Sequence, residues 1–352
     1  MERVKYLIGT FLLMITATAG AQDTTVSKGS LILTGSVDAY YRYNFANAAD
    51  SARTNNFTSF TNSQNSFELG MASLKADYTI GKVEAVADLG FGRRAEEFSY
   101  NDKGTLAAIK QAYLTYAPSG KVKFTIGKWM THVGYELCDA YLNRNYSMDY
   151  MFSYGPFFHT GIKADINAGK NITLMAGIAD PTDRVSASFS KKNILGQVHV
   201  FSTNNKLNAY LNYLGGKDIA ETSVNQVDLI FTGIVNSRFS IGYNGTIRSV
   251  KPVSGSRNAW WASAVYFNYD PSSALGLTLR SEYFGDNKGV AGLGTGIYDL
   301  TLSAGIHMDA LTIIPEFRLD GAKDPVFYKN TDTNAPSSRT TGSFILATTF
   351  HF

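Results

Sequence analysis

The stretch LILTGSVDAYYRYNF, residues 31–45, decides the fold class of this chain. Its odd-numbered positions, from Leu31 to Phe45, are glycine, aliphatic or aromatic, whereas its even-numbered positions include Asp38 and Arg42. A period of two indicates a β-strand whose two faces meet different surroundings. Because the stretch is longer than the roughly five or six residues of a globular strand, it fits a tilted strand of about 9–11 residues that crosses a bilayer.

The same alternation recurs along the chain. Apolar and polar residues exchange places at every second position in residues 83–91, 122–126, 207–213, 239–247, 275–283, 299–307 and 343–352. Short connections rich in Gly, Asn, Asp and Pro lie near residues 80–82, 117–120, 167–170, 203–206, 236–237, 270–273 and 309–310. Longer connections lie between them, near residues 46–66, 93–106, 128–158, 181–192, 215–225, 249–258, 287–296 and 321–340. This pattern predicts about sixteen strands, an even number that leaves both termini on the periplasmic side.

These observations predict an all-β fold, a closed antiparallel transmembrane β-barrel with short periplasmic turns and long extracellular loops. Closure is required because an open sheet edge cannot lie in lipid. A soluble two-sheet β-sandwich would also alternate, but it explains neither the long strands nor the terminal Phe352. A change of parity near Ser73 predicts a bulge, and Pro315 predicts a bulge or a locally broken pair within residues 311–320.

The N-terminus has the pattern of a secretory signal peptide. Arg3 and Lys5 precede an apolar stretch, and small residues end at Ala21. We therefore expect residues 1–21 to be a signal peptide and residues 22–352 to form the barrel. The alternative, a membrane anchor, requires a longer apolar segment than this one.

Composition excludes several function classes. The net charge of +3 is too small to indicate nucleic acid as a partner. The five His residues show no metal-ligand spacing, and no glycine-rich phosphate loop precedes a helix, so we expect no metal and no cofactor. The single Cys138 cannot form an internal disulfide, and we assign it no chemistry.

Charged residues at inward positions are the candidates for lining a water-filled lumen. They are Asp38, Arg42, Lys75, Asp77, Glu84, Asp88, Lys123, Lys163, Asp165, Arg280, Glu282, Glu316, Arg318 and Asp320. Such charges can shape conductance, or they can form a solvated polar face with ion pairs across strands. We expect Arg280, Glu282, Glu316 and Arg318 to lie on neighbouring strands and to form a charge ladder.

The longest connection, residues 129–158, is a candidate constriction loop. Its ionisable residues include Glu136, Asp139 and Arg144, and its aromatic residues include Tyr135, Tyr141, Tyr146, Tyr150, Phe152 and Tyr154. A loop this apolar is not expected to extend into water. We expect it to fold into the lumen, with its rings on the wall and these three charges facing ions. The alternative is a loop packed on the outer rim or against a partner subunit.

Several segments resemble the OmpL-like outer-membrane β-barrel porin family found in Bacteroidetes and their relatives. They are Gly35–Tyr41, Gln111–Leu114, Gly127–Trp129, Gly134–Glu136, Asn145–Ser147, His159–Gly161, Arg280–Phe284 and Pro315–Asp320. Their order and spacing extend over nearly the whole chain after the signal peptide. The resemblance implies a porin or passive channel without fixing the solute.

We therefore expect an outer-membrane porin through which small hydrophilic solutes and ions diffuse. A solute-selective channel, for example for sugars, is the alternative, followed by an adhesin or a hydrolase. Ser147 and His159 are the one pair that a hydrolase could use, and they carry no spacing signature. The expected partners are outer-membrane lipid, small solutes and, through the C-terminal Phe352, the outer-membrane assembly machinery. A homotrimer is suggested by analogy to porins alone.

Overall fold

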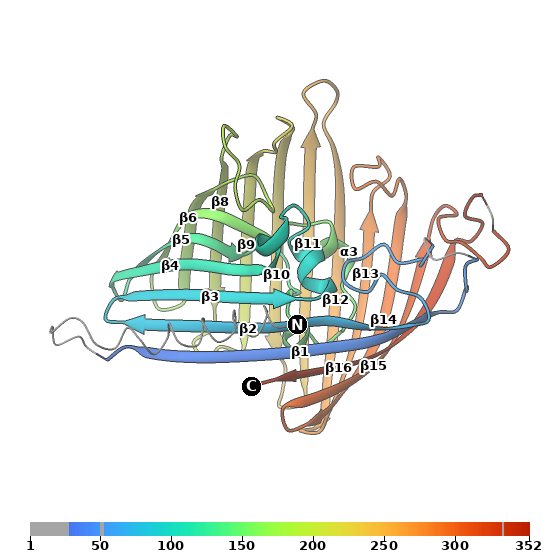
Figure 1. Cartoon of the computed structure of the whole chain (residues 1–352), viewed down its shortest axis with the longest axis horizontal. Helices are drawn as coiled ribbons and strands as arrows, with labels where there is room; N and C mark the ends of the chain where they lie inside the picture. Colours follow the sequence, from blue (N-terminus) through green and yellow to red (C-terminus); the bar gives the residue numbers. More distant parts are fainter. Residues whose placement is uncertain (1–27, 50–52, 333) are drawn as a thin grey trace, which may run out of the picture.

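The chain forms one closed barrel of sixteen antiparallel strands (Figure 1). This computed structural model describes residues 28–49, 53–332 and 334–352, so the expected signal peptide lies outside the described residues. The strands are β1 (Ser30–Asn44), β2 (Ser66–Ile80), β3 (Val83–Phe91), β4 (Ile109–Ser119), β5 (Val122–Met130), β6 (Phe158–Asn167), β7 (Ile172–Ala179), β8 (Asn193–Phe201), β9 (Leu207–Lys217), β10 (Ser223–Ile234), β11 (Phe239–Lys251), β12 (Asn258–Ser272), β13 (Leu275–Gly285), β14 (Gly296–Met308), β15 (Leu311–Ala322) and β16 (Thr340–His351). The predicted fold class is confirmed.

Strands β1 and β16 join the two ends of the chain and close the sheet. Val37 pairs with Phe350, and the ladder continues to Asn44 opposite Ser343. Beyond it, Gly35 and Phe352 exchange two backbone hydrogen bonds of 3.1 and 3.0 Å. A side chain at Gly35 would meet the Phe352 ring, since a Cβ there would lie 2.4 Å from it. A larger residue at position 35 would therefore have to displace the exposed Phe352 ring.

The two faces of each strand meet different surroundings, as the alternation predicts. On β14 the outward Tyr298, Leu300 and Leu302 are exposed, whereas the inward Asp299 and Thr301 are buried. Apolar side chains outside and polar side chains inside are the arrangement of a barrel that separates lipid from a polar interior. Among the described residues, no helix is long and apolar enough to cross a membrane.

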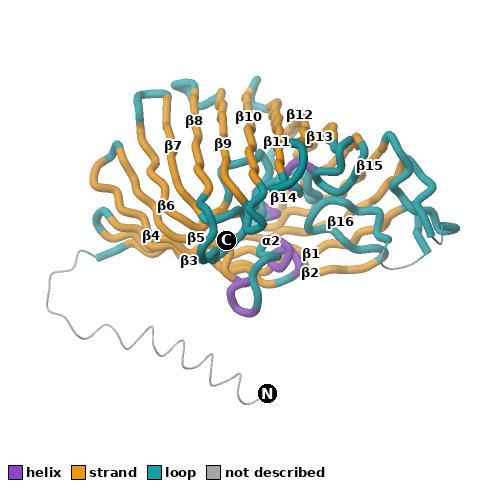
Figure 2. The backbone as a smooth tube through the Cα atoms, turned by 90° about the horizontal axis from the view of Figure 1, so that it is seen from above, coloured by secondary structure: helices purple, strands orange, loops and turns teal. Residues whose placement is uncertain are grey.

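The connections alternate in length, so one end of the barrel carries the short turns and the other end carries the long loops. Five loops at the long-loop end matter below: L1 (45–65), L2 (92–108), L3 (131–157), L4 (180–192) and L5 (218–222). L2 contains helix α2 (Arg93–Phe98) and the 3₁₀ helix η1 (Gly104–Ala108). L3 contains the 3₁₀ helix η2 (Ala140–Leu142) and helix α3 (Tyr150–Ser153). Figure 2 shows loop segments and short helices within the ring of strands.

The two predicted irregularities are present, one of them displaced. The register between β1 and β2 shifts between Leu69 and Met71, so the bulge is at Gly70 and not near Ser73. Glycine is required there because the Asp38 carboxylate would lie 1.8 Å from a Cβ at this position. Pro315 pairs with Leu346 on β16, whereas the ladder to β14 is interrupted beside it without a change of register. A proline has no N–H to donate to that ladder.

The alternation predicts opposite accessibility for two adjacent residues on β6. Ile162 faces outward and is 50% exposed in the isolated chain, whereas the Lys163 side chain faces the lumen and is 20% exposed. In bilayers, a water-soluble maleimide is expected to label Lys163→Cys and to leave Ile162→Cys unlabelled. The parent chain is the control, because its Cys138 is buried. Labelling of position 162 alone would show that the strand is registered one residue out of phase.

Candidate functional site in the barrel lumen

Loop L3 lies inside the barrel, against inward-facing side chains of the opposite wall. Strand β5 continues to Met130 and β6 begins at Phe158, so the loop is slightly shorter than the expected 129–158. Its residues Tyr146, Met148 and Tyr150 are almost completely buried. A loop with this many rings packs in the lumen because the wall supplies both apolar contacts and hydrogen-bond partners.

Two glutamates of the wall hold the L3 backbone. Glu316 on β15 accepts hydrogen bonds from the amides of Tyr146 (2.7 Å) and Ser147 (3.0 Å). Glu282 on β13 accepts from the amides of Tyr150 (2.7 Å) and Met151 (2.9 Å). Each carboxylate therefore binds two consecutive N–H groups, and charge-assisted bonds of this kind are stronger than neutral ones.

Two arginines hold carbonyl groups of the same loop. Arg280 on β13 donates to the Ser147 carbonyl (2.6 Å), and Arg318 on β15 donates to the Met148 carbonyl (2.7 Å). The expectation that β13 and β15 are neighbours is wrong, because β14 lies between them. Asp299 on β14 joins the two sides of the ladder, 2.8 Å from Arg280 and 3.6 Å from Arg318.

Tyrosine hydroxyls and a lysine complete the attachment of L3. Tyr146 donates to Asp38 (2.5 Å), and Tyr150 donates to Asp320 (2.9 Å). Lys110 of β4 pairs with the loop residue Asp139 at 2.5 Å. L3 is thus bonded to β1, β4, β13 and β15, and it crosses the interior of the barrel.

Apolar side chains from three loops fill the space beside L3. One buried cluster contains Phe60 of L1, Phe98 of L2 and, from L3, Met148, Phe152 and Phe157. Burial of these rings removes apolar surface from water and stabilises the loops against one another. The packing lies inside the ring of strands, which differs from the alternative of a loop packed on the outer rim.

The three loop charges expected to face ions lie in different surroundings. Glu136 pairs with Arg280 at 2.7 Å, and both groups are buried. Burial and the nearby Asp149 carboxylate raise the pKa of Glu136. Asp139 is buried beside Lys110, so these two carboxylates hold the loop and do not face open solvent. Arg144 pairs with Asp270 at the short-turn end of β12, where both side chains are partly exposed.

The remaining expected wall residues divide into two groups. Arg42 is buried and holds L1 by donating to the carbonyls of Ser63 (2.7 Å) and Thr54 (2.9 Å). Lys123 is exposed on β5. Inward charges near the short-turn end of β2 and β6 are also partly exposed, as the pairs Lys75–Asp77 and Lys163–Asp165 show. The polar space left beside L3 is therefore bordered by charges of both signs.

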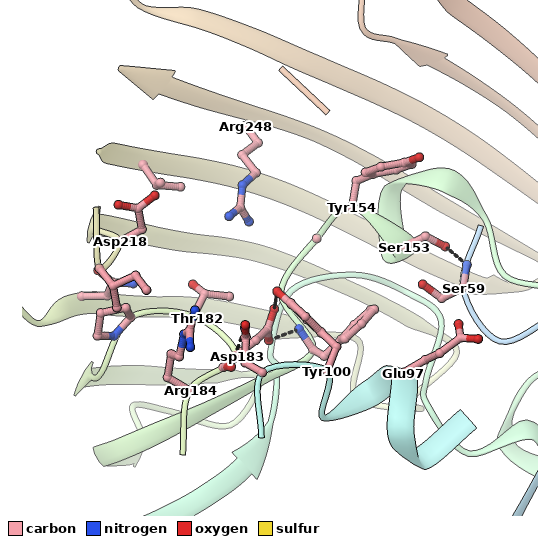
Figure 3. A pocket seen from close by; sticks show the side chains of 17 residues that line it. Ser59, Glu97, Tyr100, Ser153, Tyr154, Thr182, Asp183, Arg184, Asp218 and Arg248 are labelled. Atoms are coloured by element: carbon pink, nitrogen blue, oxygen red, sulfur yellow. Dashed lines mark hydrogen bonds between the residues drawn. The ribbon is translucent and has the colours of Figure 1, made fainter. Parts of the chain in front are cut away.

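A cavity of about 620 Å³ opens at the long-loop end (Figure 3). Its walls come from L1 to L5 and from the adjoining ends of β8, β10 and β11. Tyr100 donates to Asp183 at 3.0 Å, and burial raises the pKa of Asp183 to about 6. Arg184 and Arg248 also line the cavity.

Several residues of this site were not among the expected ones. Asp299 could have been predicted from the sequence, because it occupies an inward position in the alternating pattern of its strand. Lys110 turns inward because the register of β3 and β4 shifts beside it, between the pairs Asp88–Gln111 and Leu89–Ile109. Arg94 lies on α2, where no alternation exists to indicate its direction, and it donates to the Cys138 carbonyl at 3.0 Å.

The pair considered for hydrolase chemistry is not brought together. The Ser147 amide and carbonyl are held by Glu316 and Arg280. His159 instead bonds to the Thr131 hydroxyl at 3.0 Å. In the described part of the chain, no group of three or more His, Cys, Asp or Glu residues is arranged to hold a metal ion.

Comparisons with known proteins agree with this architecture. A family model described as "Putative beta-barrel porin-2, OmpL-like" matches residues 30–352. The outer-membrane channel DcaP of Acinetobacter baumannii superposes with a TM-score of 0.63 at 13% identity, over 95% of this chain and 100% of that one. The anion-selective porin from Comamonas acidovorans gives 0.62 at 11% identity, over 92% of this chain and 100% of that one.

A third structure, the trimer form of OmpT from Vibrio cholerae, gives a TM-score of 0.62 at 12% identity, over 93% of this chain and 100% of that one. At these identities the likeness shows the fold alone. No curated protein matches the sequence.

The anchoring of L3 can be tested at Glu316. Replacement by Ala removes the acceptor of two loop amides and is expected to lower the free energy of unfolding by roughly 1.5–3 kcal/mol. Urea titration in detergent, followed by tryptophan fluorescence, measures the change. Glu316→Gln keeps one acceptor oxygen and should lose less, and Glu84→Gln, an inward residue outside the L3 contacts, is the control. Equal stability of Glu316→Ala and the parent would show that the loop needs no such anchor.

Proposed function

The chain belongs to the OmpL-like beta-barrel porin family and is an outer-membrane porin, and from this premise we propose that L3 forms the constriction of its channel. The observation that carries the proposal is the attachment of L3 across the lumen, from Lys110 on one side to Glu282 and Glu316 on the other. A loop that is attached to the wall at several points narrows the pore permanently, because it cannot move in and out of the lumen. The family and fold are those of a channel rather than an enzyme.

Small hydrophilic solutes and ions are the proposed cargo. The partly exposed pairs Lys75–Asp77 and Lys163–Asp165 border the polar space with balanced charge, which favours a pore of low selectivity. The alternative is a sugar-selective channel, supported by aromatic rings near the lumen such as Tyr135 over Tyr266. Conductance in planar bilayers separates the two, since block by micromolar sugar requires a binding site and an ohmic current without block does not.

We further propose assembly as a homotrimer in outer-membrane lipid. Support comes from the trimer form of the similar OmpT barrel. Export by a signal peptide formed by residues 1–21 and recognition of the C-terminal Phe352 by the outer-membrane assembly machinery complete the proposal. N-terminal sequencing of the mature protein tests the cleavage before Gln22.

Shortening L3 tests its role as the constriction. Replacing residues 136–150 by a short glycine-serine linker removes the crossing segment and is expected to raise single-channel conductance. The matched control is replacement of residues 253–256, an exposed part of the long-loop end. If both shortened chains fold and conduct like the parent, L3 does not limit the current.

Neutralising the L3 carboxylates tests its contribution to ion selectivity. Glu136→Gln and Asp139→Asn each remove one carboxylate partner from a buried cation, so that Arg280 keeps Asp299 and Lys110 keeps Asp88. The electrostatic potential in the lumen becomes more positive. The reversal potential measured in a salt gradient should therefore shift in the direction of anion selectivity. The exposed Glu221→Gln serves as the control, and an unchanged reversal potential in the double variant would argue against L3 as the selectivity element.

A further inference from the structure

The cavity at the long-loop end is lined by two arginine side chains, Arg184 and Arg248 (Figure 3). Its volume of about 620 Å³ lies within the range of small-molecule sites, about 300–1,000 Å³. It is built from five loops, of which L3 also forms the proposed constriction.

The carboxylates of the cavity wall are occupied by the protein itself. Asp183 accepts from the amides of Phe157 (2.7 Å) and Phe158 (3.0 Å) as well as from Tyr100. Asp218 closes L5 by accepting from the amides of Ala220 and Thr222 at 2.8 and 2.9 Å. These two carboxylates hold the loops in place, and several of their oxygens already accept hydrogen bonds from the protein.

Glu97, the third acid of the wall, joins L2 to L1. Its carboxylate accepts from the Phe60 amide at 2.7 Å and pairs with Arg93 at 3.3 Å. All three acids therefore have structural partners within the loops.

The two arginines of the wall are not occupied in this way. Arg248, near the end of β11, donates one hydrogen bond, to Gln226 at 3.0 Å. Within the residues that the structure describes, Arg184 makes no hydrogen bond, and neither arginine forms an ion pair. A guanidinium has five N–H donors in a planar fork that fits a carboxylate. Figure 3 shows the Arg248 guanidinium directed into the cavity.

Aromatic rings provide the remaining recognition surface. Tyr100, Tyr154 and Phe157 line the same cavity, and the Phe157 ring packs edge-on against Tyr100 with 6.1 Å between centroids. Flat or apolar groups of a ligand gain by contact with such rings. The acids nearby oppose a ligand that carries several negative charges, which favours a single carboxylate.

We propose that this cavity binds a small organic monocarboxylate, with its carboxylate on Arg248 and its flat or apolar body against Tyr100, Tyr154 and Phe157. The inference deepens the proposed porin function, on which it rests, by naming a class of solute. Arg184 adds a second positive charge at the rim. The site holds the solute at the long-loop end and so raises its concentration above L3.

Benzoate is the probe, added to the long-loop side of single channels in planar bilayers. Millimolar benzoate is expected to interrupt the current of the parent channel. Arg248→Gln should raise the half-blocking concentration by about tenfold or more, because a charge-assisted bidentate pair is lost. Arg248→Lys keeps the positive charge but loses the planar guanidinium, so its half-blocking concentration should lie between those of the parent and Arg248→Gln. The control is Arg257→Gln, which changes an exposed arginine at the same end that bonds to Ser249. Benzoate should block this variant at the same concentration as the parent.

Equilibrium titration of benzoate into the detergent-folded protein separates failure of the site from failure of the channel. Binding that is lost in Arg248→Gln, in a chain that carries no current, would support the site and overturn the porin function. Current in the parent without benzoate binding would overturn the site and leave the porin function standing. Equal block by inorganic phosphate, or block that Arg248→Gln leaves unchanged, would also overturn the assignment of a monocarboxylate.

Discussion

The pairing of β1 with β16 is the constraint on which the rest of the structure depends. A backbone N–H or C=O group that faces lipid without a hydrogen-bond partner costs on the order of several kcal/mol. The seam from Ser36 opposite His351 to Asn44 opposite Ser343 removes the two edges that the sheet would otherwise expose. Once the sheet is closed, every inward side chain faces a shared interior, and the long loops at one end can occupy it.

Charged side chains of the barrel wall organise the interior. They bind the backbone of L3 in addition to pairing with one another. Glu282 and Glu316 each bind two amides of L3, while Arg280 and Arg318 bind its carbonyls. These hydrogen bonds, together with the ion pairs to the central Asp299, offset the free-energy cost of removing the charged groups from water. Removing one partner would leave the other unpaired in a poorly hydrated place, so the loop position depends on the whole ladder.

Much of the fold follows from local pattern, whereas the site depends on distant contacts. Period-two alternation in single segments was enough to predict sixteen strands and the inward direction of Asp38 and Arg280, because each strand meets lipid and lumen independently of the others. The partners of Glu136 and Asp139 could not be read in this way. They depend on how L3 crosses to strands far away in the sequence, and on bulges such as the one beside Lys110 that rotate a side chain without a local signal.

The seam between the chain ends also sets an order of events in folding. Strand β16 follows the other fifteen described strands in the chain, so closure must join segments separated by nearly the whole barrel sequence before any seam contact forms. The groups that hold L3 on β13 and β15 likewise follow the loop in the chain. A chain in which β16 has not yet paired therefore has an unpaired edge at β1, and L3 lacks its attachment until β13 and β15 have formed. Protection of both until the C-terminal strand arrives is a requirement that this topology places on the cell.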